Sequence, residues 1–477
     1  MRFLCVNPPR VGGHAVVREE RFEHKDIGSV YTPLSLLYCA AVAEREGHEA
    51  RVLDANGRDL TLQDVEAELE AFKPAAVLIR LGFDTQEPDT LVLKAAKARG
   101  IATLVRCKIV GDVPWLVDQY LGAHPEVDAF ILDEPECLLP AILKALPLGM
   151  EALKTAPGLV LNLPGGPFRT PEAGKMPDPD TLPRPAYHLL PDLKPYHTGV
   201  MAAPFTMVQT SRGCPYTCSF CSFGNLPWRT RKIEEVLAEL AWLKADYGVT
   251  RILFFDDVLT LDMKRAERLM RGMIDMKLGL EWVCCTRANA VTKDLLLLMK
   301  QAGCKEIAFG IESGSDTVLE DTTKGVTKDQ IRQAARWCHE LGILFYGLAI
   351  IGLPGETEQS VQDTIDFINE IEPFYSQFGF CTPFPNTETF DWYKSRGFLK
   401  TEDWSQYFPL GDRPIVRTEA LSEDDLVRLR KRMYWAVLLR PAKLLRAVRW
   451  GDWAYNWMGF KKVLGRVAML ARGGAVR

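Results

Sequence analysis

The sequence contains no stretch of about 18 uninterrupted apolar residues, the length that a membrane-spanning helix requires. It also begins without a secretory signal pattern, because the short apolar run after Met1 stops at Pro8 and Pro9. A net charge of −4 over 477 residues gives the chain no global attraction for nucleic acid. We therefore expect a cytoplasmic protein that does not cross a membrane and has no nucleic-acid partner.

Two other patterns are missing. No Gly-x-Gly-x-x-Gly follows the first predicted strand, so a nicotinamide or flavin dinucleotide is not indicated. Twelve cysteines spread over a chain of two or three expected domains do not form the dense disulfide framework of a small secreted domain. Thiols in a reducing compartment are instead structural, metal-binding or catalytic.

Residues 1–145 alternate between strand and helix patterns and predict a Rossmann-like, doubly wound parallel sheet. Residues 146–200 lose this alternation and are rich in proline, which indicates a linker. The expected strands are Arg2–Val6, Ala50–Leu53, Ala75–Leu81, Ala102–Val105 and Ala129–Leu132.

A second alternating series occupies residues 201–395 and predicts a partial (β/α)6 barrel, whose chemistry lies at the carboxyl ends of its strands. Residues 396–477 show no strand alternation and predict a helical region. Together these patterns define an α/β fold class. The expected barrel strands are 205–211, 251–257, 281–287, 305–313, 343–352 and 376–384.

Several helix ends in this series carry local signals. Thr327 and Gln330 form a capping-box pattern, and Gly342 is the expected stop of the same helix. Thr292 is placed to cap another helix, and Gly248 to end the one that begins near residue 232.

Three cysteines follow the first barrel strand directly, as Cys214-x3-Cys218-x2-Cys221. Three thiolates can hold a 4Fe-4S cluster and leave one iron without a protein ligand. A structural zinc site would need a fourth ligand, and no further cysteine or histidine is close in the sequence. Core packing is the remaining alternative, but a turn-like loop with Pro215 suits it poorly. The spacing favours the cluster.

Short motifs at the ends of the next predicted barrel strands would lie at the same end of the barrel as the three cysteines. Phe255-Asp256-Asp257 ends the second strand and Cys285-Thr286-Arg287 the third, while Gly310-Ile311-Glu312-Ser313-Gly314-Ser315 ends the fourth. Ile350–Glu356 follows the fifth. With the three cysteines, the stretch from 205 to about 390 resembles the radical S-adenosylmethionine (SAM) superfamily. The resemblance implies that the amino and carboxylate groups of SAM chelate the open iron.

This resemblance also implies the residues that contact SAM. Phe220 matches the position whose backbone meets the adenine, and Asp257 lies in the segment that receives the amino group. Arg287 is implied for the carboxylate or the ribose. No catalytic acid or base stands out among Tyr216, Asp257, Tyr346 and Glu356.

The later strands supply the other implied contacts with SAM. Ser313 is a second candidate for the carboxylate or the ribose, and Glu312 for the ribose or a supporting ion pair. Ile351 belongs to the segment that packs against the adenine. Taken alone, a Gly-Glu-Ser run is as compatible with an ordinary turn as with a binding site.

A Rossmann-like domain ahead of such a barrel resembles the subgroup with an N-terminal cobalamin-binding domain, which includes methyltransferases, hopanoid-modifying enzymes and the anaerobic magnesium-protoporphyrin ester cyclase. Residues 182–187 of the linker also resemble that subgroup. The chain departs from it at Lys108 and Pro135, where glycines usually allow close approach of the corrin. The resemblance implies cobalamin as a third cofactor, and a vestigial domain that shapes the substrate pocket is the alternative.

Residues 428–477 combine many arginines and lysines with Trp435, Trp450, Trp453 and Trp457. This pattern suits peripheral contact with a membrane surface. Packing of the aromatic residues against the barrel is an equally good interpretation. A lipid-like or otherwise apolar small-molecule substrate is compatible with both.

The leading hypothesis is therefore a radical SAM enzyme that functionalises an unactivated carbon, by cobalamin-dependent C-methylation. Cobalamin-free cyclisation, rearrangement or oxidation is the alternative reaction. An electron carrier would usually complete all four cluster ligands, and an RNA-modifying enzyme would usually carry an RNA-binding module. The leading hypothesis requires an external one-electron reductant of the flavodoxin or ferredoxin type.

Overall fold

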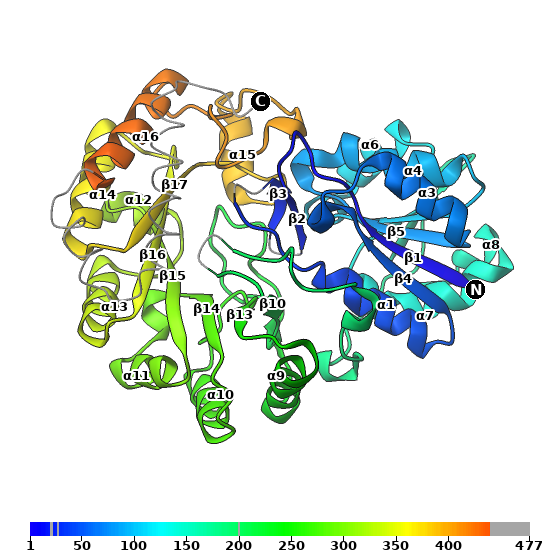
Figure 1. The fold of residues 1–477 in the computed structure, drawn as a ribbon. Helices are drawn as coiled ribbons and strands as arrows, with labels where there is room; N and C mark the ends of the chain where they lie inside the picture. The colour runs from blue at the N-terminus through cyan, green and yellow to red at the C-terminus, as the bar shows by residue number, and fades with distance from the viewer. Residues whose placement is uncertain (20–21, 26–27, 199–200, 439–477) are drawn as a thin grey trace. The chain divides into compact units, whose positions relative to one another are not determined.

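The computed structural model describes residues 1–19, 22–25, 28–198 and 201–438, and Figure 1 shows their helices and strands. The chain forms two compact units that divide between Tyr196 and His197. Among the described helices, none is both long enough and apolar enough to span a bilayer.

The first unit is built on a seven-stranded sheet in the order β4-β1-β5-β6-β7-β8-β9. Its first five strands run parallel, as predicted, and β1 and β5 are buried almost throughout because helices cover both faces of the sheet. The parallel strands are β1 (Arg2–Asn7), β4 (Glu49–Asp54), β5 (Ala76–Arg80), β6 (Ala102–Arg106) and β7 (Ala129–Ile131).

Helices cover the two faces of this sheet in two groups (Figure 1). Helices α1 and α7 pack together on one face, and α3, α4 and α6 lie on the other. The longer helices are α1 (Leu34–Arg45), α3 (Leu62–Phe72), α4 (Gln86–Lys97), α6 (Pro114–Ala123) and α7 (Pro135–Ala145). Three single-turn helices are α2 (Ala55–Arg58), α5 (Lys108–Gly111) and α8 (Met150–Leu153).

One part of the predicted linker, residues 146–200, is instead part of the sheet. Strands β8 (Leu159–Leu163) and β9 (Gly166–Arg169) continue it beyond β7 in antiparallel order. The sheet is therefore mixed rather than wholly parallel. The apolar side chains of β8 pack into the core with α7, and the Pro164-Gly165 turn that joins the two strands resembled a linker in sequence.

The first unit also contains a hairpin that the sequence analysis did not identify. Strands β2 (Val16–Glu19) and β3 (Phe22–Lys25) pair antiparallel after β1. Arg18 and Glu19 of this hairpin are both buried. The Glu19 carboxylate accepts a hydrogen bond from the backbone N–H of Ser35, in the first turn of α1.

The second unit contains the predicted six-stranded parallel sheet, in the order β10-β13-β14-β15-β16-β17. Strands β10 and β17 each pair with one neighbour, so the barrel is partial, and its helices lie on the outside (Figure 1). The strands are β10 (Phe205–Val208), β13 (Arg251–Phe254), β14 (Glu281–Thr286), β15 (Cys304–Glu312), β16 (Leu344–Ile351) and β17 (Tyr375–Phe380).

Each predicted helix end in this unit is confirmed. Thr327 and Gln330 form a reciprocal capping box, and Gly342 ends the same helix in the left-handed conformation. Thr292 caps α11, and Gly248 ends α9. The helices are α9 (Ile233–Tyr247), α10 (Met263–Asp275), α11 (Lys293–Gln301), α12 (Asp316–Asp321), α13 (Lys328–Leu341), α14 (Glu358–Ile371) and α15 (Glu388–Ser395).

The predicted C-terminal helical region, residues 396–477, begins instead with mostly irregular chain over 396–422, which contains one 3-10 turn at Trp404–Gln406. Helix α16 (Glu423–Leu438) follows and packs against α14 and β17. Arg430 of this helix is buried with its guanidinium 3.7 Å from the centre of the Phe380 ring. Trp450, Trp453 and Trp457, with most of the predicted basic segment, lie outside the described residues.

Candidate functional site

The three cysteines lie on one loop at the carboxyl end of β10, where a parallel barrel places its chemistry. A short antiparallel ladder closes the base of the loop, because β11 (Ser211–Arg212) pairs with β12 (Arg229–Thr230). We call residues 213–228 the cluster loop. The ladder holds the two ends of the cluster loop together, and the three cysteines lie between those ends.

The shape of the cluster loop depends on close backbone contacts. Gly213 has a φ of +85°, and a Cβ atom there would lie 2.3 Å from the carbonyl oxygen of Pro227. The N–H of Leu226 donates to the carbonyl of Cys214 at 2.8 Å, and the N–H of Cys221 donates to that of Cys218 at 3.0 Å. Glycine is therefore required at 213, and the loop is held independently of its thiols.

The outer side of the cluster loop is tied to two other strand ends. The N–H of Ser219 donates to the carbonyl of Thr322 at 3.0 Å, after α12. The N–H of Thr389 in α15 donates to the carbonyl of Ser219 at 3.1 Å, and the Thr323 hydroxyl donates to the carbonyl of Thr217 at 2.7 Å. These contacts join the loop to the connections that follow β15 and β17.

The thiols share one partly buried environment. Burial raises the pKa of Cys221 to about 11, and the nearby Cys218 and Cys214 thiols raise it further. Burial also raises the pKa of Cys214. In the described part of the chain, no group of three His, Cys, Asp or Glu side chains is arranged to hold a single metal ion. Three thiols on one loop are the type of ligand that iron–sulfur clusters use.

The end of β13 anchors the segment that precedes the cluster loop. Asp256 is fully buried and accepts hydrogen bonds from the N–H and hydroxyl of Thr210, at 3.1 and 2.7 Å, and from the Ser211 hydroxyl. Arg265 of α10 donates to the carbonyl of Thr210 at 2.8 Å. Burial raises the pKa of the Asp256 carboxyl, whereas these hydrogen bonds lower it. Sequence reasoning did not find Arg265, because no local signal separates it from an exposed helical arginine.

The structure brings two of the predicted SAM-binding residues to the cysteines. Asp257 is only partly buried, and its charge raises the pKa values of both Cys214 and Cys221. Arg287 follows β14, and its Nη1 lies 3.7 Å from the Sγ of Cys218. Phe220 lies within the cluster loop and is half-buried.

The end of β15 holds a buried ion pair. Lys324 Nζ lies 2.5 Å from Oε1 of Glu312, and both side chains are almost completely buried. Glu312 has a φ of +60°, at a register shift between β15 and β16. A Cβ on Gly310 would lie 2.3 Å from both of these charged groups. The Gly-Glu-Ser run is therefore shaped around this ion pair and is more than an ordinary turn.

Ser313 and Ile351 are the two predicted SAM-binding residues whose side chains are fully buried. Ser313 is fully buried, and its hydroxyl oxygen lies 3.3 Å from that of Thr364 in α14. The same oxygen accepts from the N–H of Ser315. Ile351 is fully buried at the end of β16. Both side chains are thus enclosed by neighbouring parts of the barrel, and their contact with SAM stays a prediction.

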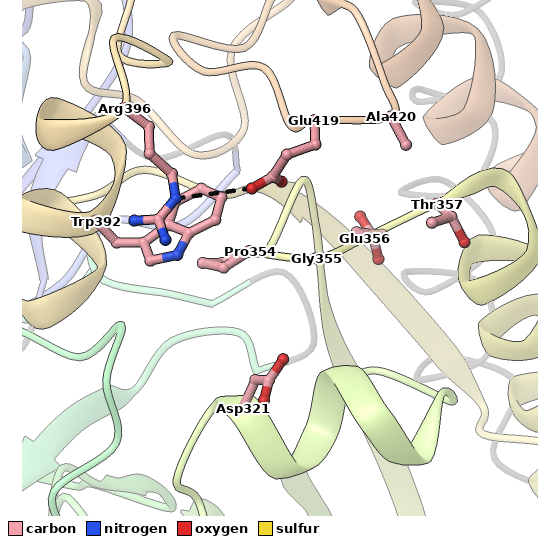
Figure 2. Close-up of a pocket in the computed structure, with 9 residues that line it drawn as sticks. All are labelled: Asp321, Pro354, Gly355, Glu356, Thr357, Trp392, Arg396, Glu419 and Ala420. Atoms are coloured by element: carbon pink, nitrogen blue, oxygen red, sulfur yellow. Dashed lines mark ion pairs between the residues drawn. The ribbon is translucent and has the colours of Figure 1, made fainter.

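A cavity of about 310 Å³ opens beside the loop between β16 and α14. Figure 2 shows Glu356 on this loop, Trp392 of α15 and Arg396 directly after α15, with a dashed line for the ion pair between Arg396 and Glu419, whose distance is 3.8 Å. None of the predicted SAM-binding residues lines this cavity. Glu356 itself accepts a hydrogen bond from the N–H of Gly352, so its carboxyl closes the loop.

Glu356 predicts a pH dependence of stability. Burial raises the pKa of its carboxyl to about 8 from an ordinary value of 4.5. Between these values the folded state binds the proton and the unfolded state does not, so the free energy of unfolding falls as the pH rises. Glu356→Gln, which imitates the protonated acid, is expected to flatten this fall in chemical denaturation between pH 5 and pH 8.

The matched control for this experiment is Glu358→Gln, because Glu358 is exposed two residues later, as the first residue of α14. That variant is expected to keep the wild-type slope. Glu19, whose pKa burial also raises to about 8, leaves a residual slope in both variants. A slope that Glu356→Gln does not change would mean that Glu356 is ionised throughout this range.

In the first unit, polar side chains occupy the carboxyl edge of the sheet. Arg18 bridges the ends of β1 and β5: its Nη1 donates to the carbonyl of Pro8 at 3.0 Å, and its Nε donates to Asp89 at 2.8 Å. Asp89 also accepts from the N–H of Gly82 at 2.9 Å. The strand order reverses between β1 and β5, which is where doubly wound sheets bind ligands.

Comparisons with known proteins agree with this architecture. Residues 208–368 match the model of the Radical SAM superfamily. An uncharacterised methyltransferase of Pyrococcus horikoshii is 31% identical over 94% of this chain and 95% of its own length. The cytidylyl-2-hydroxyethylphosphonate methyltransferase of Streptomyces wedmorensis is 26% identical over 80% of this chain and 81% of its own.

A solved structure has the same fold over nearly the whole chain. It is the radical SAM methyltransferase TsrM of Kitasatospora setae, with cobalamin and a 4Fe-4S cluster bound. The TM-score is 0.70, with 17% identity over 98% of this chain and 99% of that one.

Proposed function

This chain belongs to the radical SAM superfamily, and we propose that it is an enzyme that reductively cleaves SAM and methylates an unactivated carbon of its substrate. The observation that supports this most directly is the cluster loop, which presents three thiols at the carboxyl end of β10 beside the ends of β13 and β14. The named methyltransferases among its relatives support methylation as the reaction.

In this proposal Cys214, Cys218 and Cys221 hold the 4Fe-4S cluster. When bound, the cluster supplies the electron that cleaves SAM. Asp257 and Arg287 lie beside the cysteines and are proposed to orient the amino and carboxylate groups of SAM. The remaining proposed contacts with SAM are Phe220, Glu312, Ser313 and Ile351, of which the last two would act mainly through the shape of the strand ends.

Cobalamin is proposed as the methyl carrier, held by the first unit at the carboxyl edge of its sheet. Lys108 and Pro135 were expected to obstruct it there. Nζ of Lys108 lies 2.6 Å from a carboxylate oxygen of Asp112, and its side chain is only 7% exposed, so it folds back along α5. Pro135 is buried as the first residue of α7. Both side chains thus pack within the unit, which supports the proposal that this edge of the sheet accepts a corrin.

Radical SAM enzymes act on small molecules and take electrons from an external reductant. For this chain we propose an apolar or lipid-like substrate, a reductant of the flavodoxin or ferredoxin type, and a cytoplasmic location. Peripheral membrane contact through residues 428–477 is part of the same proposal.

Anaerobic reconstitution with iron, sulfide and hydroxocobalamin, followed by desalting and an absorption spectrum, tests this function. Retained corrin and iron–sulfur absorbance, with 5′-deoxyadenosine formed from SAM and dithionite, is the expected result. A cluster that cleaves SAM without retained corrin would instead indicate a cobalamin-free cyclisation, rearrangement or oxidation. Absence of any cluster would contradict the proposal as a whole.

A further inference from the structure

Arg287 has an unusual set of contacts at the end of β14. Its Nη1 points to the Sγ of Cys218 at 3.7 Å, within hydrogen-bond range for a sulfur acceptor. Its guanidinium carbon lies 3.6 Å from the centre of the Tyr216 ring, which belongs to the same cluster loop. The side chain is only 6% exposed, so its charge acts in a poorly screened environment.

Other contacts hold the guanidinium in this place. Its Nη2 donates to the carbonyl of Lys324, and its Nε donates to Oδ1 of Asn289 at 3.3 Å. Lys324 is itself fixed by the buried ion pair with Glu312 and by a 2.6 Å hydrogen bond to the carbonyl of Gly310. Three nitrogens of Arg287 are therefore engaged by the protein, and the end of β15 supports its position.

We propose that Arg287 is a positioning residue that sets the reduction potential of the cluster held by Cys218. A guanidinium that donates to a ligand sulfur stabilises the reduced cluster, because reduction adds a negative charge beside it. Hydrogen bonds to the sulfurs and the local charge are two of the factors that set such potentials. The inference rests on the proposed function, since it requires Cys218 to be a cluster ligand.

This role differs from binding the carboxylate of SAM, because it operates before SAM arrives. The N–H to sulfur contact and the Tyr216 contact are both made within the protein alone. The charge of Arg287 therefore acts on the cluster in the absence of SAM. The two roles separate in experiments that omit or add SAM.

The test is a redox titration of the reconstituted cluster in the absence of SAM. Electron paramagnetic resonance measures the reduced cluster at each potential. Arg287→Gln is expected to shift the midpoint to a more negative potential than that of the wild type. Arg287→Lys keeps the positive charge but loses the planar guanidinium. Its midpoint potential is expected to lie between those of the wild type and Arg287→Gln. Tyr216→Leu, which removes the supporting ring, is expected to shift the midpoint in the same direction as Arg287→Gln.

Arg430→Gln is the matched control. Arg430 is also 6% exposed and lies 3.7 Å from the centre of an aromatic ring, but that ring is Phe380 of β17 rather than a residue of the cluster loop. The midpoint potential of the Arg430→Gln variant is expected to equal that of the wild type. An equal shift in Arg430→Gln would show a general effect of destabilisation and overturn the proposal.

Three further results of these experiments bear on the proposed role of Arg287. A wild-type midpoint in Arg287→Gln, with SAM binding weakened, would assign Arg287 to the SAM carboxylate alone and overturn the inference while leaving the proposed function in place. Failure of the wild type itself to assemble a cluster would overturn both. If Arg287→Gln does not assemble a cluster, Arg287→Lys and Tyr216→Leu still give a midpoint that confirms or contradicts the shift.

Discussion

Cys218→Ala, reconstituted without oxygen, is expected to form no 5′-deoxyadenosine from SAM and to lose the iron–sulfur absorbance. Cys218→Ala removes one of the three direct ligands of the cluster. The loss of SAM cleavage is therefore expected to exceed the roughly 10- to 100-fold loss of activity or metal affinity that follows substitution of a residue around the ligands. The fold is expected to persist, because the backbone hydrogen bonds of Cys218, Ser219 and Cys221 hold the loop without the thiol. Liquid chromatography of the reaction and iron analysis of the protein measure the effect.

Cys304→Ala is the control for this experiment. Cys304 is a buried thiol of the same unit, at the start of β15 and outside the cluster loop. It is expected to keep its iron content and its SAM cleavage. Full SAM cleavage in Cys218→Ala would contradict the assignment of the cluster and, with it, the proposed function.

Asp89→Asn is expected to destabilise the first unit by about 3–5 kcal/mol, the typical cost of leaving one partner of a buried ion pair unpaired. Arg18 and Asp89 are 2% and 1% exposed in their side chains, and they meet through two hydrogen bonds of 2.5 and 2.8 Å. The substitution leaves the Arg18 charge buried at the junction of β1 and β5. Hydrogen exchange of peptides from these two strands measures the loss within this unit.

Two comparison variants make this prediction specific. The pair Arg51–Glu68 is also close, at 2.9 Å, but its side chains are 50% and 26% exposed. Glu68→Gln is therefore expected to cost less than about 1 kcal/mol. The double variant Arg18→Met with Asp89→Leu is expected to recover much of the loss, because it leaves no unpaired buried charge. Equal protection of β1 in Asp89→Asn and wild type would mean that the pair contributes little to stability.

The parts of the fold that local sequence predicts well are those set by neighbouring residues. The capping box of Thr327 and Gln330 involves residues three apart, and the left-handed stop at Gly342 needs only a residue without a Cβ atom. The alternation that predicted six barrel strands is likewise local, and all six are present. Strands β8 and β9 were missed because only Pro164 and Gly165 separate them and β9 itself begins with Gly166 and Pro167, so the segment resembled a loop.

In the candidate site, too, the sequence predicts features that depend on residues close together in the chain, and it does not predict features that depend on packing. The spacing of Cys214, Cys218 and Cys221 was sufficient to indicate a cluster, since one loop carries all three thiols. Ser313 and Ile351 were selected by their position at strand ends, and their contact with SAM stays a prediction; the structure adds that both side chains are buried. Burial of a side chain at a strand end depends on what packs against it, and the sequence pattern does not contain that information.

The sequence by itself determined the α/β class, the barrel, the helix ends and the three thiols of the cluster loop, because each depends on residues close together in the chain. Only the tertiary structure placed Arg287 beside Cys218, 69 residues away, and Arg18 against Asp89, 71 residues away. In both cases a charged side chain meets a partner from an element far away in the sequence, which only the folded unit brings near. Contacts of this kind follow from the register and packing of whole strands, which no short sequence motif encodes.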